Sequence, residues 1–193
     1  MKFPNNIILA SESLRRKNLL LQLGIKKFRI SKHNIDENKF EFNFPLSNSL
    51  KKLAEMKAIS VKKNLKNKQI VISGDTLVYR AGKIFHKTDS KSEVKNYLTL
   101  LSNRKHHVYG GICVISLNGK IFTKVVKTEV YFNKIEKKDL TKEVLEDGLG
   151  KAGGYAIQSY GARFIKKIRG CYTNIVGISI PELYKILKNL NLI

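Results

Sequence analysis

The chain has 193 residues, with 37 Lys and Arg against 15 Asp and Glu, and therefore a formal net charge of +22. Hydrophobic residues make up 42% of the sequence, which is enough for a sizeable core and excludes an intrinsically disordered chain. The length is typical of one domain, and we expect a single domain over residues 1–193. The excess of cations predicts an anionic partner, but the lysines are scattered, which equally fits compositional drift.

Several classes of protein are excluded by what the sequence lacks. Cys113 and Cys171 lie far apart without CxxC spacing, and the four histidines form no HExxH pattern, so no disulfide framework or zinc module is indicated. No apolar run approaches the ~18 residues of a transmembrane helix. The apolar stretch at residues 7–10 is shorter than the ~7–15-residue core of a signal peptide. We expect a cytoplasmic protein without a membrane segment.

The pattern of apolar residues and breakers predicts alternating strands and helices. In chain order, we expect a strand at 5–10, a helix at 11–23, a loop at 34–45, a helix at 49–61, strands at 69–78 and 83–86, a helix at 90–101, long strands at 108–117 and 121–135, a short helix at 141–146, a strand at 174–178 and a helix from 181. Ser11 or Ser13 can cap the first helix, and Ser90-x-x-Glu93 is typical of a capping box. Asn118-Gly119 predicts a hairpin between the long strands. The fold class is therefore α/β, with a mixed β-sheet and flanking helices.

The segment after the first predicted strand is a candidate anion site. Ser11 is followed by Arg15 and Arg16 in the first turn of a helix, where positive charge opposes the helix dipole. A bound phosphate would remove this conflict, because free backbone N–H groups and guanidinium groups would converge on it. The alternative, which this segment alone slightly favours, is a pair of solvated arginines.

Lys57 lies among apolar residues on one face of its predicted helix. Lysine is almost never fully buried without a partner, so its ammonium must reach solvent, pair with an acid, or line a cleft that receives an anion. Reaching solvent is the default interpretation, and a cleft lysine is the second.

Asp75 is the sharpest candidate, because it interrupts the apolar run at residues 69–78. An unpaired charge in such a strand costs several kcal/mol. The carboxyl end of an α/β strand is also where ligand crevices form, and an Asp there can hold a metal or act as a general base. The alternative is an ordinary turn residue after Gly74, but the apolar run continues beyond Asp75, which favours function.

Further candidates are weaker when taken singly. The adjacent acids Asp36 and Glu37 can share a magnesium ion, although such pairs are more often solvated. Lys87 precedes a capped helix, again a geometry that suits an anion. Gln158 can read a base edge with its amide, or it is an ordinary exposed glutamine. No Ser/His/Asp or Cys/His set is visible, so covalent catalysis is not indicated.

Taken in order, these segments resemble the Maf family of nucleoside triphosphate pyrophosphatases. The matching segments are IILASESLRRKNLLLQLG, the Asp36-Glu37 pair, LAEMKA around Lys57, ISGDTLV around Asp75, the Lys87 segment, LSNRKHHV, and KAGGYAIQ through NIVGISIPEL. The sequence departs from the family pattern at Leu14, Thr88, Asn103, Gly110 and Gly150. The charged positions persist through these departures.

The resemblance implies a fold with two lobes around a deep cleft, a homodimer, and hydrolysis of a nucleoside triphosphate to the monophosphate and diphosphate with Mg²⁺ or Mn²⁺. It implies Asp75 as the proton acceptor and Glu37 with Asp75 as metal ligands. It also assigns phosphate contacts, to Ser11, Arg15, Arg16, Lys57 and Lys87. Arg15, Thr76 and Gln158 match positions that accompany a preference for dTTP and UTP.

Two other functions stay open at this point. One is the 7-methyl-GTP-cleaving branch of the family, which typically has tryptophan at the position of Arg15 and glutamate at that of Gln158. The other is a non-catalytic, basic nucleic-acid-binding module, motivated by the net charge of +22. No RNP-like aromatic motif appears and the bases are not clustered in sequence, so we expect a nucleotide substrate and no stable nucleic acid. A role in cell division is implied only by the family name.

Overall fold

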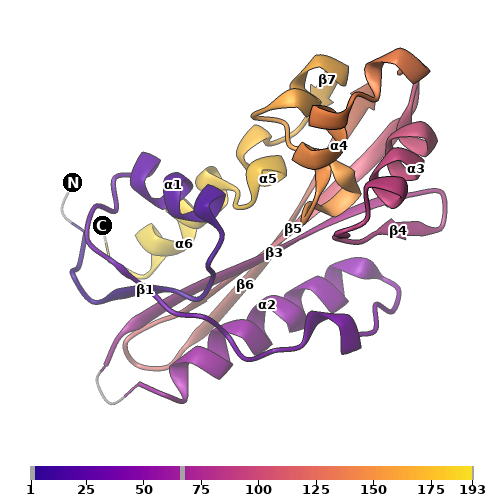
Figure 1. The fold of residues 1–193 in the computed structure, drawn as a ribbon. Coiled ribbons are helices and arrows are strands. Elements are labelled where there is room, and N and C mark those ends of the chain that lie inside the picture. Colours follow the sequence, from indigo (N-terminus) through magenta and orange to yellow (C-terminus); the bar gives the residue numbers. More distant parts are fainter. Residues whose placement is uncertain (1–2, 66–67, 193) are drawn as a thin grey trace. The chain divides into compact units, whose positions relative to one another are not determined.

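The computed structural model describes residues 3–65 and 68–192 (Figure 1). Its strands are β1 (Ile7–Leu9), β2 (Arg29–Ile30), β3 (Ile70–Arg80), β4 (Lys83–Phe85), β5 (Lys105–Ile115), β6 (Ile121–Phe132) and β7 (Ile165–Arg169). Its α-helices are α1 (Leu14–Gln22), α2 (Leu46–Lys62), α3 (Lys91–Leu101), α4 (Lys142–Gly148), α5 (Tyr172–Val176) and α6 (Ile180–Asn189). Short 3₁₀ helices are η1 (Glu37–Lys39), η2 (Lys137–Asp139), η3 (Ala152–Gly154) and η4 (Tyr160–Phe164).

The described strands form one mixed sheet in the order β2-β1-β3-β5-β6-β7, with β4 paired to β3. β1 pairs in parallel with both β2 and β3, whereas β4 pairs antiparallel with β3 and β7 antiparallel with β6. β5 and β6 are joined by the tight turn around Gly119, as the Asn-Gly pair predicts. The predicted α/β class with a mixed sheet and flanking helices is confirmed.

The chain forms two compact units, which we describe separately. Unit 1 comprises the described residues of Met1–Asp75, Gly110–Val126 and Gly177–Ile193. Unit 2 comprises Thr76–Tyr109 and Lys127–Val176. The expectations of a single domain over residues 1–193 and of a deep cleft between two lobes stay predictions.

In unit 1, α2 packs its apolar stripe against the sheet. The buried cluster draws on α2 and on three strands: Ile8, Ala10, Ala54, Ala58, Val61, Val71, Cys113 and Ile115. Gly111 of β5 allows the helix to approach closely, because a Cβ there would lie 2.9 Å from the Leu50 carbonyl oxygen. Burial, followed by the charge of Glu55, raises the pKa of the Cys113 thiol to about 12.

Helix starts show which capping predictions are correct. Ser13, one of the two predicted caps, accepts a hydrogen bond from the Arg16 N–H at the start of α1. The predicted start of α2 at Ser49 is wrong: the helix begins three residues earlier, after Pro45, whose lack of an N–H suits a helix start. The Ser49 hydroxyl instead holds the preceding loop, by accepting from the Asn43 N–H and donating to the Asn43 carbonyl.

In unit 2, the Ser90 half of the predicted capping box at the start of α3 is confirmed, because the Ser90 hydroxyl accepts from the Glu93 N–H. The Ser90 N–H donates to the Thr88 hydroxyl instead of to Glu93. The Glu93 carboxylate accepts from the Tyr97 hydroxyl. The core of unit 2 is aromatic: the buried His106 ring donates to or accepts from the Tyr155 hydroxyl at 2.8 Å and packs edge-on against Phe132. Burial, with smaller contributions from His107 and Arg80, lowers the pKa of His106 to about 3.

Two predictions of local structure in the last third of the chain are wrong. Residues 174–178 were expected as a strand, but Tyr172–Val176 forms helix α5, where the buried Asn174 amide donates to the Val108 carbonyl and to the Thr128 hydroxyl. A short apolar run does not distinguish a buried helix from a strand. The strand of this region is β7, whose basic IKKIR sequence lacks the alternation that would predict it. The two-residue β2 is too short to carry a pattern.

Candidate functional site

The middle of β3 positions the candidate residues of unit 1 through the alternation of a strand. Ser73 donates to the Ala54 carbonyl and Asp75 contacts Lys57, so both point to α2. Gly74 points to the opposite face, where a Cβ would lie 3.3 Å from Ile178 and 3.6 Å from Arg16 Nε. Residues 73–75 therefore contribute to two polar groups of side chains, one on each face of β3. The expectation that Asp75 lies at the carboxyl end of its strand is wrong, because β3 continues to Arg80.

Lys57 joins two carboxylates, one from β3 and one from η1. Its side chain is 1% exposed, and its Nζ lies 2.7 Å from Asp75 Oδ1 and 2.8 Å from Glu37 Oε1. Of the three predicted fates for this lysine, pairing with an acid is confirmed, and escape to solvent is wrong. The charge of Asp75, itself 3% exposed, is thereby compensated.

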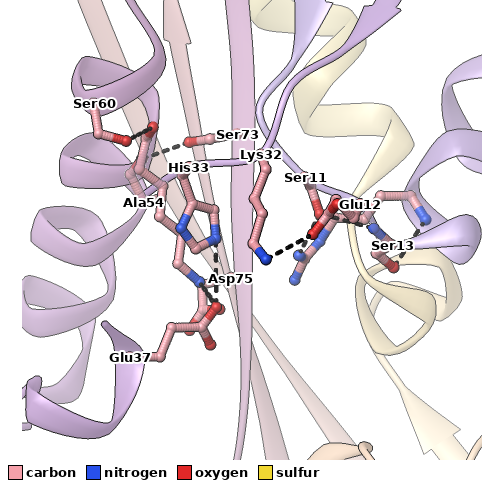
Figure 2. A network of polar contacts seen from close by, with 12 residues as sticks. Ser11, Glu12, Ser13, Lys32, His33, Glu37, Ala54, Ser60, Ser73 and Asp75 are labelled. Carbon is pink, nitrogen blue, oxygen red and sulfur yellow. Dashed lines mark hydrogen bonds and ion pairs between the residues drawn. The ribbon is translucent and has the colours of Figure 1, made fainter. Parts of the chain in front are cut away.

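Glu37 and its neighbour Asp36 point in different directions. Glu37 accepts from Lys57, and His33 Nε2 lies 3.5 Å from the same oxygen. Figure 2 shows the His33 side chain pointing toward Glu37. Asp36 is exposed, with Lys39 Nζ 3.8 Å from its carboxylate. Glu37 therefore joins Asp75 at Lys57, and the sharing of a magnesium ion by the two adjacent acids stays a prediction.

Arg16 and Ser11 form the second polar group. Arg16 is 8% exposed, and it donates from NH1 to the Ser11 hydroxyl at 3.1 Å and from Nε to the Gly177 carbonyl at 3.2 Å. Burial lowers the pKa of Arg16, while the charges of Asp75 and Glu37 oppose this shift. A guanidinium remains charged in proteins, so a buried cation stands at the start of α1. The interpretation of Arg16 as a solvated surface arginine is wrong.

A glycine that the sequence reasoning did not single out makes room for Arg16. Gly177 has φ of +151°, and a Cβ there would lie 3.2 Å from Arg16 Cγ. The side chain therefore runs past two positions without side chains, Gly74 and Gly177. The sequence contains no pattern that would have linked Gly177 to an arginine 161 residues earlier.

The remaining predicted residues are divided between the two units. Arg15 is half-buried in the first turn of α1 in unit 1. Thr76, Lys87 and Gln158 belong to unit 2: Thr76 is half-buried on β3, and the other two are exposed in loops. Lys87 follows β4, which packs against η3, the 3₁₀ helix that precedes Gln158. Within unit 1, the structure brings Ser11 to Arg16 and brings both Glu37 and Asp75 to Lys57.

His33 is the polar residue of this region that the sequence reasoning missed. Its side chain is 16% exposed, its Nε2 lies beside Glu37, and its buried Nδ1 has no hydrogen-bond partner in the described part of the chain. A lone histidine in a polar loop carries no pattern in sequence, and its proximity to Glu37 depends on the loop conformation. His33 borders the polar contacts between Lys57 and its acids.

The carboxylates offer an incomplete ligand set for a divalent cation. Glu37 Oε1 and Asp75 Oδ1 both lie within hydrogen-bond distance of one positive atom, Lys57 Nζ, so two hard oxygen donors converge on one point. In the described residues, no group of three or more His, Cys, Asp or Glu could hold a metal. Such a pair suits Mg²⁺ or Mn²⁺, which commonly bind one or two carboxylates and complete their shell with substrate phosphates and water.

Comparison with solved structures supports the fold. The chain matches the structure of a HAM1 protein from Coxiella burnetii with a TM-score of 0.50 and 15% identity, over 95% of this chain and 98% of that chain. At this identity the likeness concerns the fold alone. No helix of residues 3–65 and 68–192 is both long and apolar enough to cross a membrane.

Comparison of sequences identifies the family. A protein of Clostridium perfringens (strain SM101 / Type A) named dTTP/UTP pyrophosphatase is 36% identical over 185 residues, covering 95% of this chain and 96% of that protein. A protein of Chelativorans sp. (strain BNC1) with the same name is 38% identical over 193 residues, covering 97% and 92%. The family model described as Maf-like protein matches residues 6–190. The buried charges of unit 1 therefore lie in a chain that belongs to the Maf family.

Proposed function

We propose that this chain is a nucleoside triphosphate pyrophosphatase that hydrolyses dTTP or UTP to the monophosphate and diphosphate. The observation that carries the proposal is the gathering of Arg16, Lys57, Asp75 and Glu37 around the middle of β3 and the start of α1. The names of the relatives, which cover more than nine-tenths of this chain, support the activity and the choice of nucleotides.

The cations would act by holding a highly charged substrate. Phosphoryl chemistry on a triphosphate requires positioning and charge compensation more than covalent catalysis. Arg16 and Ser11 would bind phosphate oxygens from the start of α1, where Arg15 also lies, and Lys57 would bind them from α2. Lys87 would contribute a further phosphate contact, and Thr76 and Gln158 would favour the pyrimidine base.

Asp75 would accept the proton of the attacking water. Its Oδ1 accepts from Lys57, so Oδ2 is the atom we assign to the proton. Lys57 fixes the orientation of the carboxylate and compensates its charge in the absence of substrate. A rigidly held base fits a reaction in which water is the nucleophile.

Glu37 and Asp75 would hold a divalent metal, Mg²⁺ or Mn²⁺. The metal, when bound, compensates negative charge on the triphosphate and on the departing diphosphate. Lys57 would give up at least one of its two carboxylate contacts as the metal and the phosphates arrive, because a cation already lies between these oxygens.

We also propose a cytoplasmic homodimer that removes unwanted nucleotides from the pool. Cys113 and Cys171 form no disulfide in the described part of the chain, which suits a reducing compartment. Light scattering on the purified chain tests the dimer, and a monomeric mass would exclude it.

A panel of nucleoside triphosphates tests the proposed activity. Diphosphate release is measured with dTTP, UTP, the other common triphosphates and 7-methyl-GTP, each with Mg²⁺ or Mn²⁺. We expect dTTP and UTP to have the highest kcat/KM. A clear preference for 7-methyl-GTP would assign the chain to that branch, and an absence of turnover with every nucleotide would contradict the proposal.

Asp75→Asn is the matched variant for this panel, since it keeps the shape of the side chain and removes the base. We expect turnover to fall by about 10²–10⁴-fold, the usual contribution of a general base. Binding of dTTP, measured by calorimetry, should persist. Turnover of Asp75→Asn close to that of the wild type would remove Asp75 from the base role.

A further inference from the structure

Unit 2 carries a polar sheet face that the proposed reaction does not use. Strand alternation places Lys105, His107 and Tyr109 of β5 on this face, and Lys127, Glu129 and Tyr131 of β6 beside them. Register adds two residues of β7, since Glu129 pairs with Arg169 and Tyr131 with Lys167. Tyr79 of β3 completes the set through its ring contact with Tyr109. We call these residues the tyrosine face.

The intervening residues of the same strands form the core of unit 2. His106, Val108, Thr128, Val130 and Phe132 are all buried. His106 and Phe132 pack there against Tyr155, which follows η3. The tyrosine face is therefore the outer side of these strands, and its four lysine and arginine side chains are exposed.

Aromatic rings and cations interleave on the tyrosine face. The rings of Tyr79 and Tyr109 meet edge to face, with centroids 6.4 Å apart. Lys127 Nζ lies 5.7 Å from the centroid of Tyr109, while Lys105 Nζ and the Arg169 guanidinium lie 6.0 and 5.8 Å from that of Tyr131. Each of the two rings thus has a cation beside it.

Charge on the tyrosine face is strongly positive. Lys105, Lys127, Lys167 and Arg169 stand against one carboxylate, Glu129. That carboxylate is already engaged, because it accepts from the Tyr131 hydroxyl at 2.7 Å and from Lys105 at 3.2 Å. The free positive charge favours a polyanion and disfavours a second copy of this chain, which would bring like charges together.

We propose that the tyrosine face binds single-stranded nucleic acid, with bases stacking on Tyr109 and Tyr131 and phosphates on the surrounding cations. Sheets that present aromatic rings and cations to solvent recognise unpaired bases in this way. An anionic membrane would use the cations but not the rings, and a duplex would hide the faces of its bases. Interleaving of the two side-chain types therefore favours unpaired bases.

Energetics allow a base to replace a cation beside each ring. A cation–π contact at an exposed site contributes about 0.5–1 kcal/mol. Stacking of a base on an aromatic ring contributes about 1–3 kcal/mol. A lysine displaced from a tyrosine also gains a phosphate, so the exchange is favourable on both counts.

Fluorescence anisotropy with labelled oligouridine and oligothymidine of about 12 nucleotides, a typical single-strand site size, tests this inference. We expect both to bind, with an affinity that falls steeply between about 50 and 200 mM salt. The two oligonucleotides distinguish RNA from DNA as the source of the unpaired bases. A matched duplex should bind more weakly, and an excess of dTTP should not displace the single strand.

Two variants separate stacking from charge. Tyr109→Leu keeps an apolar side chain and should weaken binding by about 5- to 100-fold through lost stacking. Lys127→Ala/Arg169→Ala should reduce the slope of affinity against salt by about 1.4, that is, about 0.7 for each lost phosphate contact. The charge-matched control Lys95→Ala/Lys142→Ala removes two exposed lysines of unit 2 that lie on helices α3 and α4, outside the tyrosine face.

Several outcomes would overturn the inference. Equal weakening by the face variant and its control would mean that only net charge matters. Unchanged binding by Tyr109→Leu, equal affinity for the duplex, or displacement by dTTP would each exclude a stacking site on this face. All three variants should hydrolyse dTTP as the wild type does, so a failure of the proposed activity leaves this test intact.

Discussion

Lys57 shows how one buried cation can organise two acids. Its ammonium group bridges Asp75 and Glu37 from different elements, at 2.7 and 2.8 Å. Removing one partner of a buried ion pair typically costs about 3–5 kcal/mol, because the other charge remains buried and unpaired. The lysine therefore stabilises the two acids and also competes with any metal that uses the same oxygens.

Substitution of Lys57 should expose this competition. In Lys57→Met the two carboxylates lose their cation, so we expect the melting temperature to fall and Mn²⁺ affinity in the absence of nucleotide to rise by about tenfold, or about 1.4 kcal/mol. Calorimetric titration with Mn²⁺ measures the affinity. The metal should also raise the melting temperature of the variant more than that of the wild type.

Lys51→Met, an exposed residue of the same helix, is the control, and it should bind Mn²⁺ as the wild type does. Equal Mn²⁺ affinity in Lys57→Met and the wild type would show that the lysine and the metal do not compete.

For single residues, the sequence identifies candidate site residues better than it identifies the contacts that they make. Lys57 and Asp75 stand out because a charge among apolar residues needs a reason. Their pairing depends on residues 18 apart in sequence, and the Arg16 contact to Gly177 on residues 161 apart. Such distances depend on the fold, so neither His33 nor Gly177 could be predicted from local pattern.

Among the elements, α1 depends on a segment at the other end of the chain. The Arg16 side chain extends from the first turn of α1 and donates to the Gly177 carbonyl. Gly177 provides both the acceptor and the space, because its φ is positive and a Cβ would lie 3.2 Å from Arg16 Cγ. The segment before α6 therefore orients helix α1, which begins at Leu14, 163 residues before Gly177 in the sequence.

Gly177→Ala should disturb this contact. We expect a loss of about 1–3 kcal/mol in the free energy of unfolding from backbone strain. A displaced Arg16 should also lower kcat/KM for dTTP by about 10- to 100-fold, the value of a hydrogen bond to a charged group. Denaturant unfolding and steady-state kinetics measure the two effects.

Gly119→Ala is the control, since Gly119 also has a positive φ, of +83°, but no atom lies within 4 Å of its added Cβ. It should lose stability and keep its kinetics. If Gly177→Ala also kept its kcat/KM, the Gly177 contact would not matter for the site.

Elements that depend on the chemistry of adjacent residues could be predicted from the sequence, and those that depend on distant contacts could not. The Ser13 and Ser90 caps and the Asn118-Gly119 turn were predicted because each depends on a few adjacent residues. The start of α2 and the identity of α5 were not predicted, because they depend on hydrogen bonds of Ser49 and Asn174 to residues outside these helices. β7, which contributes to the tyrosine face, is a basic edge strand that sequence periodicity does not reveal.

For the whole molecule, a charge that is scattered in sequence is not scattered in space. The lysines form no block in the chain, and this favoured compositional drift as their explanation. Alternation along β5 and β6, with the register of β7, gathers four cations and two tyrosines of these strands on one surface. A period-two pattern across three strands is invisible to any search for local clusters.

The burial of Cys113 also makes its thiol a natural reporter of local opening in the core of unit 1. Thiol reagents attack the thiolate, and burial raises the Cys113 pKa to about 12, so this thiol should react only when the core of unit 1 opens. Cys171 is half-buried and should react first. With Ellman's reagent we expect one fast and one slow equivalent, and Cys113→Ala should abolish the slow one. Equal rates for both thiols would contradict a closed core. The rate of the slow reaction then measures how often the core between α2 and the sheet opens.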